Sequence, residues 1–361
     1  MSNINLKHFV DINIESHVGT SIDSTRDTVV LFTKDGENGT TNLITSMPEA
    51  ASHYSNFPDT LAYLSVYFNN GGVKVLVIEG IDYSQITLEM IEDLDDKYIM
   101  IACVSTSSTT ELAYAALKSI ASRRGSDSSI YGINEKLILA RTLVKTDSDV
   151  VKNLVVKYSS VPGAEMTIAA YLSKINVYGI NTVYDYAFTT EAIGKENVND
   201  ADFVEIMNNH MNIDIMLANE IRNCGGDCKD GSDIVNTFVK IILHQTLTDS
   251  LINLLSQKLK NSAGISKIYT TISQELENYL NCGYLTTDKI WSDEDLTVTR
   301  NGVTYTIIEK GTPLINGYLI TVLPMAALNE QEKTIHSAPP IYVIIADQYS
   351  IRKITITGEV I

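Results

Sequence analysis

Strand-like and helix-like segments alternate along the first half of the chain, and this alternation restricts the fold more than any other sequence feature. Short apolar runs rich in β-branched residues predict buried strands, and capped segments with wider apolar spacing predict helices. Alternation of the two favours a largely parallel sheet covered by helices. Strands are expected at 28–33, 73–78, 98–104, 136–140 and 154–158. Helices are expected at 57–68, 88–94 and 109–123; a further helix begins at about 46, and another follows Pro162-Gly163 and ends at 172.

The pattern after residue 200 predicts a second α/β domain. A strand is expected at 212–217, followed by a long helix that begins at Ser232 or Asp233 and reaches about 259. A shorter helix is expected at 268–280. Asn301-Gly302 lies between two β-rich runs, 296–300 and 303–308, and this is the strongest short-range signal for a hairpin. Further strands are expected at 317–323 and 341–346.

Both ends of the chain alternate apolar and polar residues, which predicts strands with one apolar face. Such strands can complete the protein's own sheet, or they can add to the sheet of a neighbouring copy. The polar linker at 15–27 favours the second interpretation for the N-terminal strand, because it gives that strand reach. The apolar positions are Ile4, Leu6, Val10, Ile12 and Ile14 at one end and Ile354, Ile356 and Val360 at the other.

We therefore expect an α/β (α+β) fold of two α/β domains with extended terminal β-arms. The predicted parts are an N-terminal arm and linker at 1–27, a first domain at 28–200, a second domain at 201–345 and a C-terminal β-arm at 346–361.

The charge and hydropathy of the sequence argue against two classes of partner. The formal net charge of −17 argues against a nucleic-acid footprint, which needs clustered basic residues. No apolar run approaches the roughly 18 residues of a membrane-spanning helix, and the N-terminus lacks a secretory signal pattern. The negative charge serves solubility, or it attracts a basic partner or keeps copies apart before assembly. Few cysteines fit a reducing compartment, and Cys103 is expected in the core.

The motifs that could carry chemistry are weak. Three residues separate Cys224 from Cys228, whereas two separate the cysteines of redox and zinc motifs, so a structural loop is favoured over a disulfide or a metal site. Asp227, Asp230 and Asp233 resemble a calcium loop only faintly, and helix capping explains them better. The six histidines form no metal-binding pair, and no phosphate loop or nucleophile elbow occurs. We expect no enzyme activity and no cofactor.

Three segments of the sequence are informative when they are taken together. The first is the N-terminal arm with F-V-D-I-N-I at 9–14 and V-V-L-F at 29–32. The second is the helix, Gly turn and strand of 54–79. The third is the passage from Gly317-Tyr318 to Pro324, then S-A-P-P-I at 337–341 and the closing strand. As a set, these segments resemble the tail sheath proteins of contractile phages and R-type bacteriocins, except that His336 stands in place of the more usual basic residue.

The resemblance implies a structural subunit that stacks as hexameric rings around an inner tail tube. Terminal arms would insert strands into neighbouring subunits, and the sheath would shorten to drive the tube through a bacterial envelope. The partners implied are further copies of the chain, the tube protein, and baseplate and tail terminator proteins. The particle would assemble in the bacterial host cytoplasm and work in the virion tail.

The resemblance also implies that the first domain faces outward and that the second domain lies inside. The helix that begins at Ser232 is the candidate tube-facing element, with Lys240 and His244 as further candidates. Two alternatives stay open. A non-contractile virion or adaptor protein predicts closed rings, and a small-molecule enzyme predicts a polar pocket and a small oligomer.

Deletion of residues 1–20 is expected to leave a folded protein that no longer polymerises, because the deletion removes the strand predicted to pair with a neighbour. Size-exclusion chromatography and electron microscopy of the truncated protein test this. Normal tubes from the truncated chain would count against the arm model.

Overall fold

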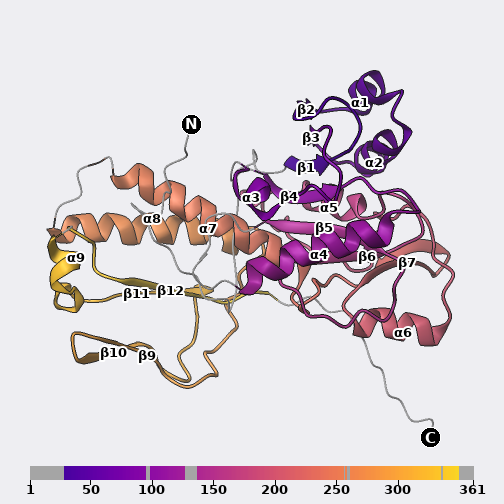
Figure 1. Ribbon diagram of the computed structural model, residues 1–361. Helices are drawn as coiled ribbons and strands as arrows, with labels where there is room; N and C mark the ends of the chain where they lie inside the picture. The colour runs from indigo at the N-terminus through magenta and orange to yellow at the C-terminus, as the bar shows by residue number, and fades with distance from the viewer. Residues whose placement is uncertain are drawn as a thin grey trace, which may run out of the picture. The chain divides into compact units, whose positions relative to one another are not determined.

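The computed structural model describes residues 28–94, 98–126, 136–255, 257, 261–334 and 336–348 (Figure 1). The described chain forms two compact units. The sheet unit comprises residues 28–175 and 184–238, and the hairpin unit comprises 176–183 and 239–348. The predicted arm positions Ile4 to Ile14 and Ile354 to Val360 lie outside the described residues.

The sheet unit is built on one eight-stranded sheet, as the alternation of elements predicts. Six central strands are parallel, and an antiparallel strand borders them on each side. The spatial order is β2-β3-β1-β4-β5-β6-β7-β8. The strands are β1 (Thr28–Phe32), β2 (Thr41–Ile44), β3 (Val75–Ile78), β4 (Tyr98–Cys103), β5 (Leu137–Thr142), β6 (Leu154–Tyr158), β7 (Asn212–Leu217) and β8 (Glu220–Cys224).

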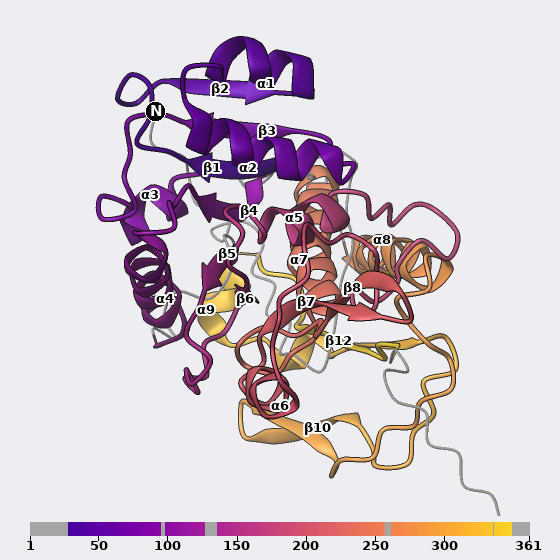
Figure 2. The ribbon, with the colours of Figure 1, turned by 90° about the vertical axis from the view of Figure 1, so that its right-hand side faces the viewer.

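The helices of this unit begin where the sequence places their caps. The side chain of Ser46 accepts a hydrogen bond from the backbone N of Glu49 at 3.4 Å, and Pro48 lies in the first turn of α1. Pro58 is the first residue of α2, although Phe57 before it makes no side-chain cap hydrogen bond. Figure 2 shows these helices beside the strands of the sheet. They are α1 (Met47–Tyr54), α2 (Pro58–Asn69), α3 (Leu88–Glu92), α4 (Thr110–Ser126), α5 (Met166–Leu172) and α6 (Asp200–Asn208).

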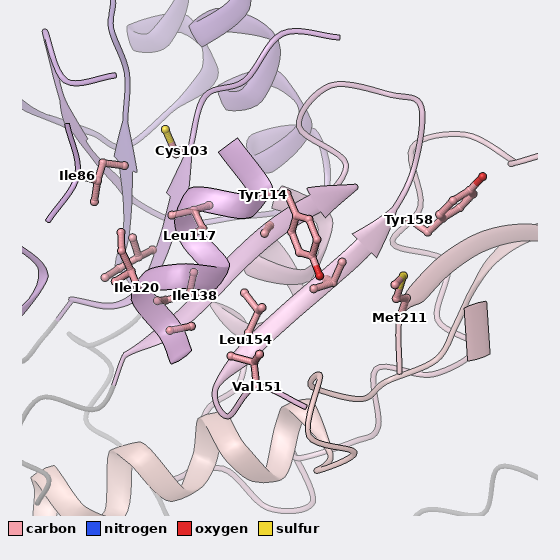
Figure 3. Packing of buried hydrophobic residues seen from close by; sticks show 14 of the residues in the cluster. Ile86, Cys103, Tyr114, Leu117, Ile120, Ile138, Val151, Leu154, Tyr158 and Met211 are labelled. Atoms are coloured by element: carbon pink, nitrogen blue, oxygen red, sulfur yellow. The ribbon is translucent and has the colours of Figure 1, made fainter. Parts of the chain in front are cut away.

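Both faces of the sheet are buried, because central strands such as β1, β5 and β6 have no exposed residue. On one face, Leu117 and Ile120 of α4 lie against Ile138 of β5 and Leu154 of β6 (Figure 3). Cys103 belongs to the same cluster and is 2 % exposed, which confirms its expected place in the core.

The long helix α7 (Ile234–Leu255) is shared between the two units. Its residues up to 238 belong to the sheet unit, and those from 239 onward belong to the hairpin unit. Asp233 rather than Ser232 caps α7, because the carboxylate of Asp233 accepts a hydrogen bond from the backbone N of Asn236 at 2.8 Å. The remaining elements are α8 (Asn261–Asn281), β9 (Leu296–Arg300), β10 (Val303–Ile308), β11 (Tyr318–Val322), a 3-10 turn (Met325–Ala327), α9 (Glu330–Thr334) and β12 (Ile341–Ile345).

The hairpin predicted at Asn301-Gly302 is confirmed. Both residues have positive φ, 51° and 77°, as a two-residue hairpin turn with matching twist requires. The side-chain amide of Asn301 also donates to the carbonyls of Ala326 and Leu328, at 3.1 and 2.9 Å. The turn residue thereby holds the neighbouring 3-10 segment in place.

The boundary between the compact units falls inside α7, at residues 238 and 239, whereas the sequence suggests a boundary near residue 200. The difference arises because β7 and β8 extend the parallel sheet and therefore belong with it. Elements β2, α6, β8 and α9 have no counterpart in the sequence-based expectation. The assignment of the domains to the outside and inside of an assembly stays a prediction.

Asp147 provides a pH-dependent contribution to the stability of the sheet unit. Its carboxylate lies 2.6 Å from Lys118 Nζ and also accepts a hydrogen bond from Tyr114. Burial acts to raise the pKa of this carboxyl group, but the bonds from Lys118 and Tyr114 outweigh burial and hold the pKa at about 2. A depressed folded-state pKa contributes stability above the unfolded-state pKa, and the contribution disappears as the pH falls through about 2.

Asp147→Asn is expected to lower the free energy of unfolding by about 1–2 kcal/mol at pH 7, with the difference vanishing towards pH 2. Urea denaturation of both proteins at pH 7, 4 and 2.5 measures this. Asp149→Asn is the matched control, because the exposed carboxylate of Asp149 pairs with the same lysine. A loss for Asp147→Asn that is equal at all three pH values would contradict the electrostatic origin.

Candidate functional site

The small sheet β11–β12 in the hairpin unit is the candidate site, because its main-chain hydrogen-bonding capacity is only half used. The two strands pair antiparallel from Tyr318 opposite Ile345 to Val322 opposite Ile341. Among the described residues this sheet has two strands, so each of them is an edge strand. Edge strands present unpaired N–H and C=O groups and act as templates for strand addition.

One face of the small sheet packs on the β9–β10 hairpin. Leu319 and its cross-strand partner Ile344 contact the apolar cluster around Ile308, and Leu323 joins the cluster around Ile307. The hydroxyl of Thr321 on this face donates to the carbonyl of Ile307 at 3.0 Å. The hairpin therefore covers one face of the sheet (Figure 1).

The opposite face of the small sheet lies against α8. The Tyr318 hydroxyl is 2.7 Å from the Ser273 hydroxyl of this helix, and β11 lies close to α8. Ile320 and Ile345, which point to the same face, are 9 % and 6 % exposed. Both faces are thus largely occupied by neighbouring elements, and the backbone edges are available for main-chain hydrogen bonds.

The outer edge of β12 can be identified from the bonds at its two ends. Leu323 N donates to Pro340 O, and Ala346 N donates to Gly317 O, at 2.9 and 2.8 Å. In an antiparallel pair alternate residues point to the partner, so residues 340, 342, 344 and 346 face β11. Ile341, Val343 and Ile345 then direct their N–H and C=O groups outward.

Within the residues that the structure describes, the chain that follows β12 leaves this outer edge open. Thr286 N donates to Ala346 O and Gln348 N donates to Tyr284 O, both at 2.9 Å. These bonds come from residues 346 and 348, which face the side of β11. Segment 284–286 therefore pairs with the chain after β12 on the same side as β11. It does not cover the outer edge of β12.

The composition of β12 makes this edge unusual. Its sequence is I-Y-V-I-I, and its first four residues are only partly buried. An apolar edge strand of this kind favours association, and a two-stranded sheet is marginally stable until further strands are added. The sequence predicts β12 as an apolar strand, but its open edge depends on which strands pair in the folded unit.

The predicted tube-facing residues lie at the start of α7 and along one side of it. Ser232 accepts and donates hydrogen bonds in the turn before the helix, with its hydroxyl 2.6 Å from Asp230 Oδ1. Lys240 and His244 are half-buried, and with Asn236 they form a stripe at four-residue spacing on a helix that is otherwise mostly buried. The tube-facing role of these residues stays a prediction.

The carboxyl edge of β4 and β5, where open α/β sheets bind ligands, is filled by buried polar side chains. The guanidinium of Arg141 donates to Thr110 Oγ1 at 2.6 Å and to Ser159 O at 3.2 Å, and Arg141 Nε lies 3.9 Å from Glu165. Burial raises the pKa of Glu165, although Arg141 opposes this shift. The side chains bind one another, which is typical of a structural network.

The cysteine- and aspartate-rich loop after β8 has the structural character that its spacing favours. Cys224 and Cys228 are free and buried, and burial raises the pKa of both thiols. Asp230 accepts from the backbone N and hydroxyl of Ser232, and Asp233 caps α7. Among the described residues, no three His, Cys, Asp or Glu side chains are grouped to hold a metal ion. No helix in that same part of the chain is long and apolar enough to cross a membrane.

Comparison with known proteins finds likeness in structure and not in sequence. No protein-family model matches the chain, and no curated protein matches it. A chain of the anti-feeding prophage baseplate, six-fold symmetrised, superposes with a TM-score of 0.65 at 15% identity, covering 99% of this chain and 98% of that one.

Two sheath structures match in the same way. The helical sheath of the anti-feeding prophage in its contracted state gives a TM-score of 0.63 at 14% identity over 97% of this chain and 98% of that one. A sheath tail protein of Desulfitobacterium hafniense gives a TM-score of 0.52 at 11% identity, covering 79% of this chain and 94% of that one. The expected α/β fold is therefore confirmed, and the chain shares the fold of contractile tail sheath proteins.

Proposed function

We propose that this chain is the structural subunit of a contractile tail sheath. Copies of it stack as hexameric rings around an inner tube, and contraction of the stack drives the tube through a bacterial envelope. Its role is structural and not enzymatic. The shared fold over nearly the full chain supports this proposal, together with the open edge of β12.

Strand addition at the β12 edge would hold neighbouring subunits together. The donors are the terminal arms, with Ile4, Leu6, Val10, Ile12 and Ile14 at one end and Ile354, Ile356 and Val360 at the other. Each main-chain hydrogen bond contributes a net ~0.5–1.5 kcal/mol, so a strand that pairs with the six outward N–H and C=O groups of Ile341, Val343 and Ile345 contributes about 3–9 kcal/mol. Repetition around each ring and along the stack makes the lattice stable.

Such strands also suit a lattice that changes shape. A strand held by its main chain at one end and joined to its own subunit by a polar linker stays bound while the subunit body rotates. Contraction then exchanges one set of contacts between bodies for another of lower free energy. The net charge of −17 makes copies repel over a Debye length of about 8 Å, and strand addition offsets this repulsion.

The remaining partners follow from the same proposal. The subunits contact the tube protein, the baseplate at one end and a tail terminator at the other, and they bind neither nucleic acid nor membrane. The half-exposed stripe of α7 with Lys240 and His244 is the proposed tube-facing element. Assembly takes place in the bacterial host cytoplasm, and the protein acts in the tail.

Val343→Pro tests the role of the β12 edge. Proline removes the outward N–H of Val343 without removing a bond to β11, and edge strands tolerate proline. We expect a folded protein with an unchanged circular dichroism spectrum that forms tubes only at a concentration about tenfold higher, or forms none. Negative-stain electron microscopy of a concentration series of both proteins is the measurement.

Thr304→Pro is the matched control for this experiment. Val303 pairs with Arg300 across the two-residue turn, so Thr304 directs its N–H to the outer edge of the hairpin. This variant is expected to form normal tubes. Closed rings or a small oligomer from the unmodified protein at every concentration would contradict the sheath proposal, and normal tubes from Val343→Pro would contradict the role of β12.

A further inference from the structure

Lys157, Asp214 and Asn223 lie on three neighbouring strands, β6, β7 and β8, and their side chains meet inside the sheet unit. Lys157 Nζ is 2.5 Å from Asp214 Oδ1 and 3.0 Å from Asn223 Oδ1. Asp214 and Asn223 are direct cross-strand partners. The three residues are 0 %, 1 % and 0 % exposed, so water is excluded from the place where they meet.

Aromatic and polar atoms hold these groups in fixed orientations. The ring centroid of Tyr186 is 5.6 Å from Lys157 Nζ, and the Tyr186 hydroxyl is 3.3 Å from the same atom. The amide nitrogen of Asn223 donates to the carbonyl of Tyr186 at 3.4 Å, which directs the amide oxygen of Asn223 towards the lysine. Tyr186 is itself fully buried.

We propose that Lys157 and Asn223 form an intramolecular amide bond, with Asp214 as the catalytic residue that moves the proton. An amine held beside a carboxamide and a carboxylate, in a site without water, contains all the groups that this condensation needs. The hydrogen bond from Nζ to Oδ1 places the nitrogen next to the amide carbon, because that carbon is only ~1.23 Å from Oδ1.

The reaction balances without any further reagent. The resting lysine is an ammonium: burial acts to lower the pKa of Lys157, but Tyr186 and Asp214 favour the charged form more strongly. Asp214 takes a proton from Nζ, and the neutral amine attacks Cγ of Asn223. The Nζ–Cγ bond forms, the Cγ–Nδ2 bond breaks, and Asp214 passes the proton to Nδ2. The second proton that Nζ gives up follows the same route, so the released nitrogen leaves as ammonium and Asp214 is again a carboxylate.

Fixed geometry accelerates the amide condensation, which is slow between side chains that are free in solution. Holding reactants at contact distance replaces a bimolecular encounter and gives large effective concentrations. Lys229 provides an internal comparison, because it is equally buried but donates to the main-chain carbonyls of Asp147 and Asn209, at 2.6 and 2.7 Å. A main-chain amide carbonyl in a folded loop offers no leaving group that can depart.

The bond would join β6 to β8 across β7 and would close a covalent loop between residues 66 positions apart. Such a cross-link restricts the unfolded chain and prevents the edge strand β8 from peeling off the sheet. A subunit that carries mechanical load through its sheet gains from this restraint.

The intact mass of the purified full-length protein tests the proposal. We expect a mass lower than the sequence requires by one ammonia, about 17 Da, and a cross-linked proteolytic peptide that contains Lys157 and Asn223. An unmodified mass would overturn the proposal. A deficit of one water, about 18 Da, would place the bond on Asp214 and would also overturn it.

Three variants locate the chemistry. Asn223→Ala and Asp214→Asn are expected to show the full unmodified mass, the first because the acceptor is gone and the second because the proton carrier is gone. Lys229→Met is expected to keep the deficit. A deficit that persists in Asn223→Ala would contradict the assignment, and the wild-type mass decides the question even if a variant fails to fold.

Discussion

The unpaired main chain along β12 is the constraint from which the proposed assembly follows. The eight-stranded sheet protects its edges: β2 has only four residues, of which two are polar, and at β8 the backbone of Asn223 exchanges hydrogen bonds with Phe188 and Thr189. Among the described residues, nothing protects the edge of the small sheet at Ile341, Val343 and Ile345 in this way. A protein that keeps an apolar edge strand open in this way needs a partner strand to complete it.

The two units differ in how they satisfy buried polar groups, and this difference suits two roles. In the sheet unit, buried charges such as Lys157 and Arg141 find their partners within the same unit, so its strands are tied to one another. Breaking such a buried pair costs far more than breaking a surface pair, and the unit is therefore expected to move as a rigid body. Within the described part of the hairpin unit, the outer edge of β12 has no partner strand. In the proposed sheath lattice, the sheet unit would move as a rigid body, and the edge of β12 would bind the arm of a neighbouring subunit.

Local sequence signals predicted most of the elements but only part of the candidate site. Apolar runs identified the six parallel strands of the large sheet, although not its edge strands β2 and β8, and Asn301-Gly302 identified the hairpin. These signals act between neighbours in the chain. Strand β8 was missed, since Asn223 and the adjacent polar residues indicate a loop until Lys157, 66 positions away, supplies a buried partner. The helix α6 was missed because it lies next to an irregular segment that has no pattern of its own. The acceptor edge of β12 could not be predicted, because pairing partners are set by tertiary contacts.

The sequence by itself determined the class of the fold, the caps and turns, and the family of structures to compare it with. Those features depend on apolar periodicity and on the backbone preferences of individual residues, which act over a few positions. Tertiary structure decided the rest: which strands form the edges of each sheet, where the unit boundary falls in α7, and which buried side chains meet. These outcomes depend on hydrogen bonds and packing between residues far apart in the chain, and they exist only when the whole unit has folded.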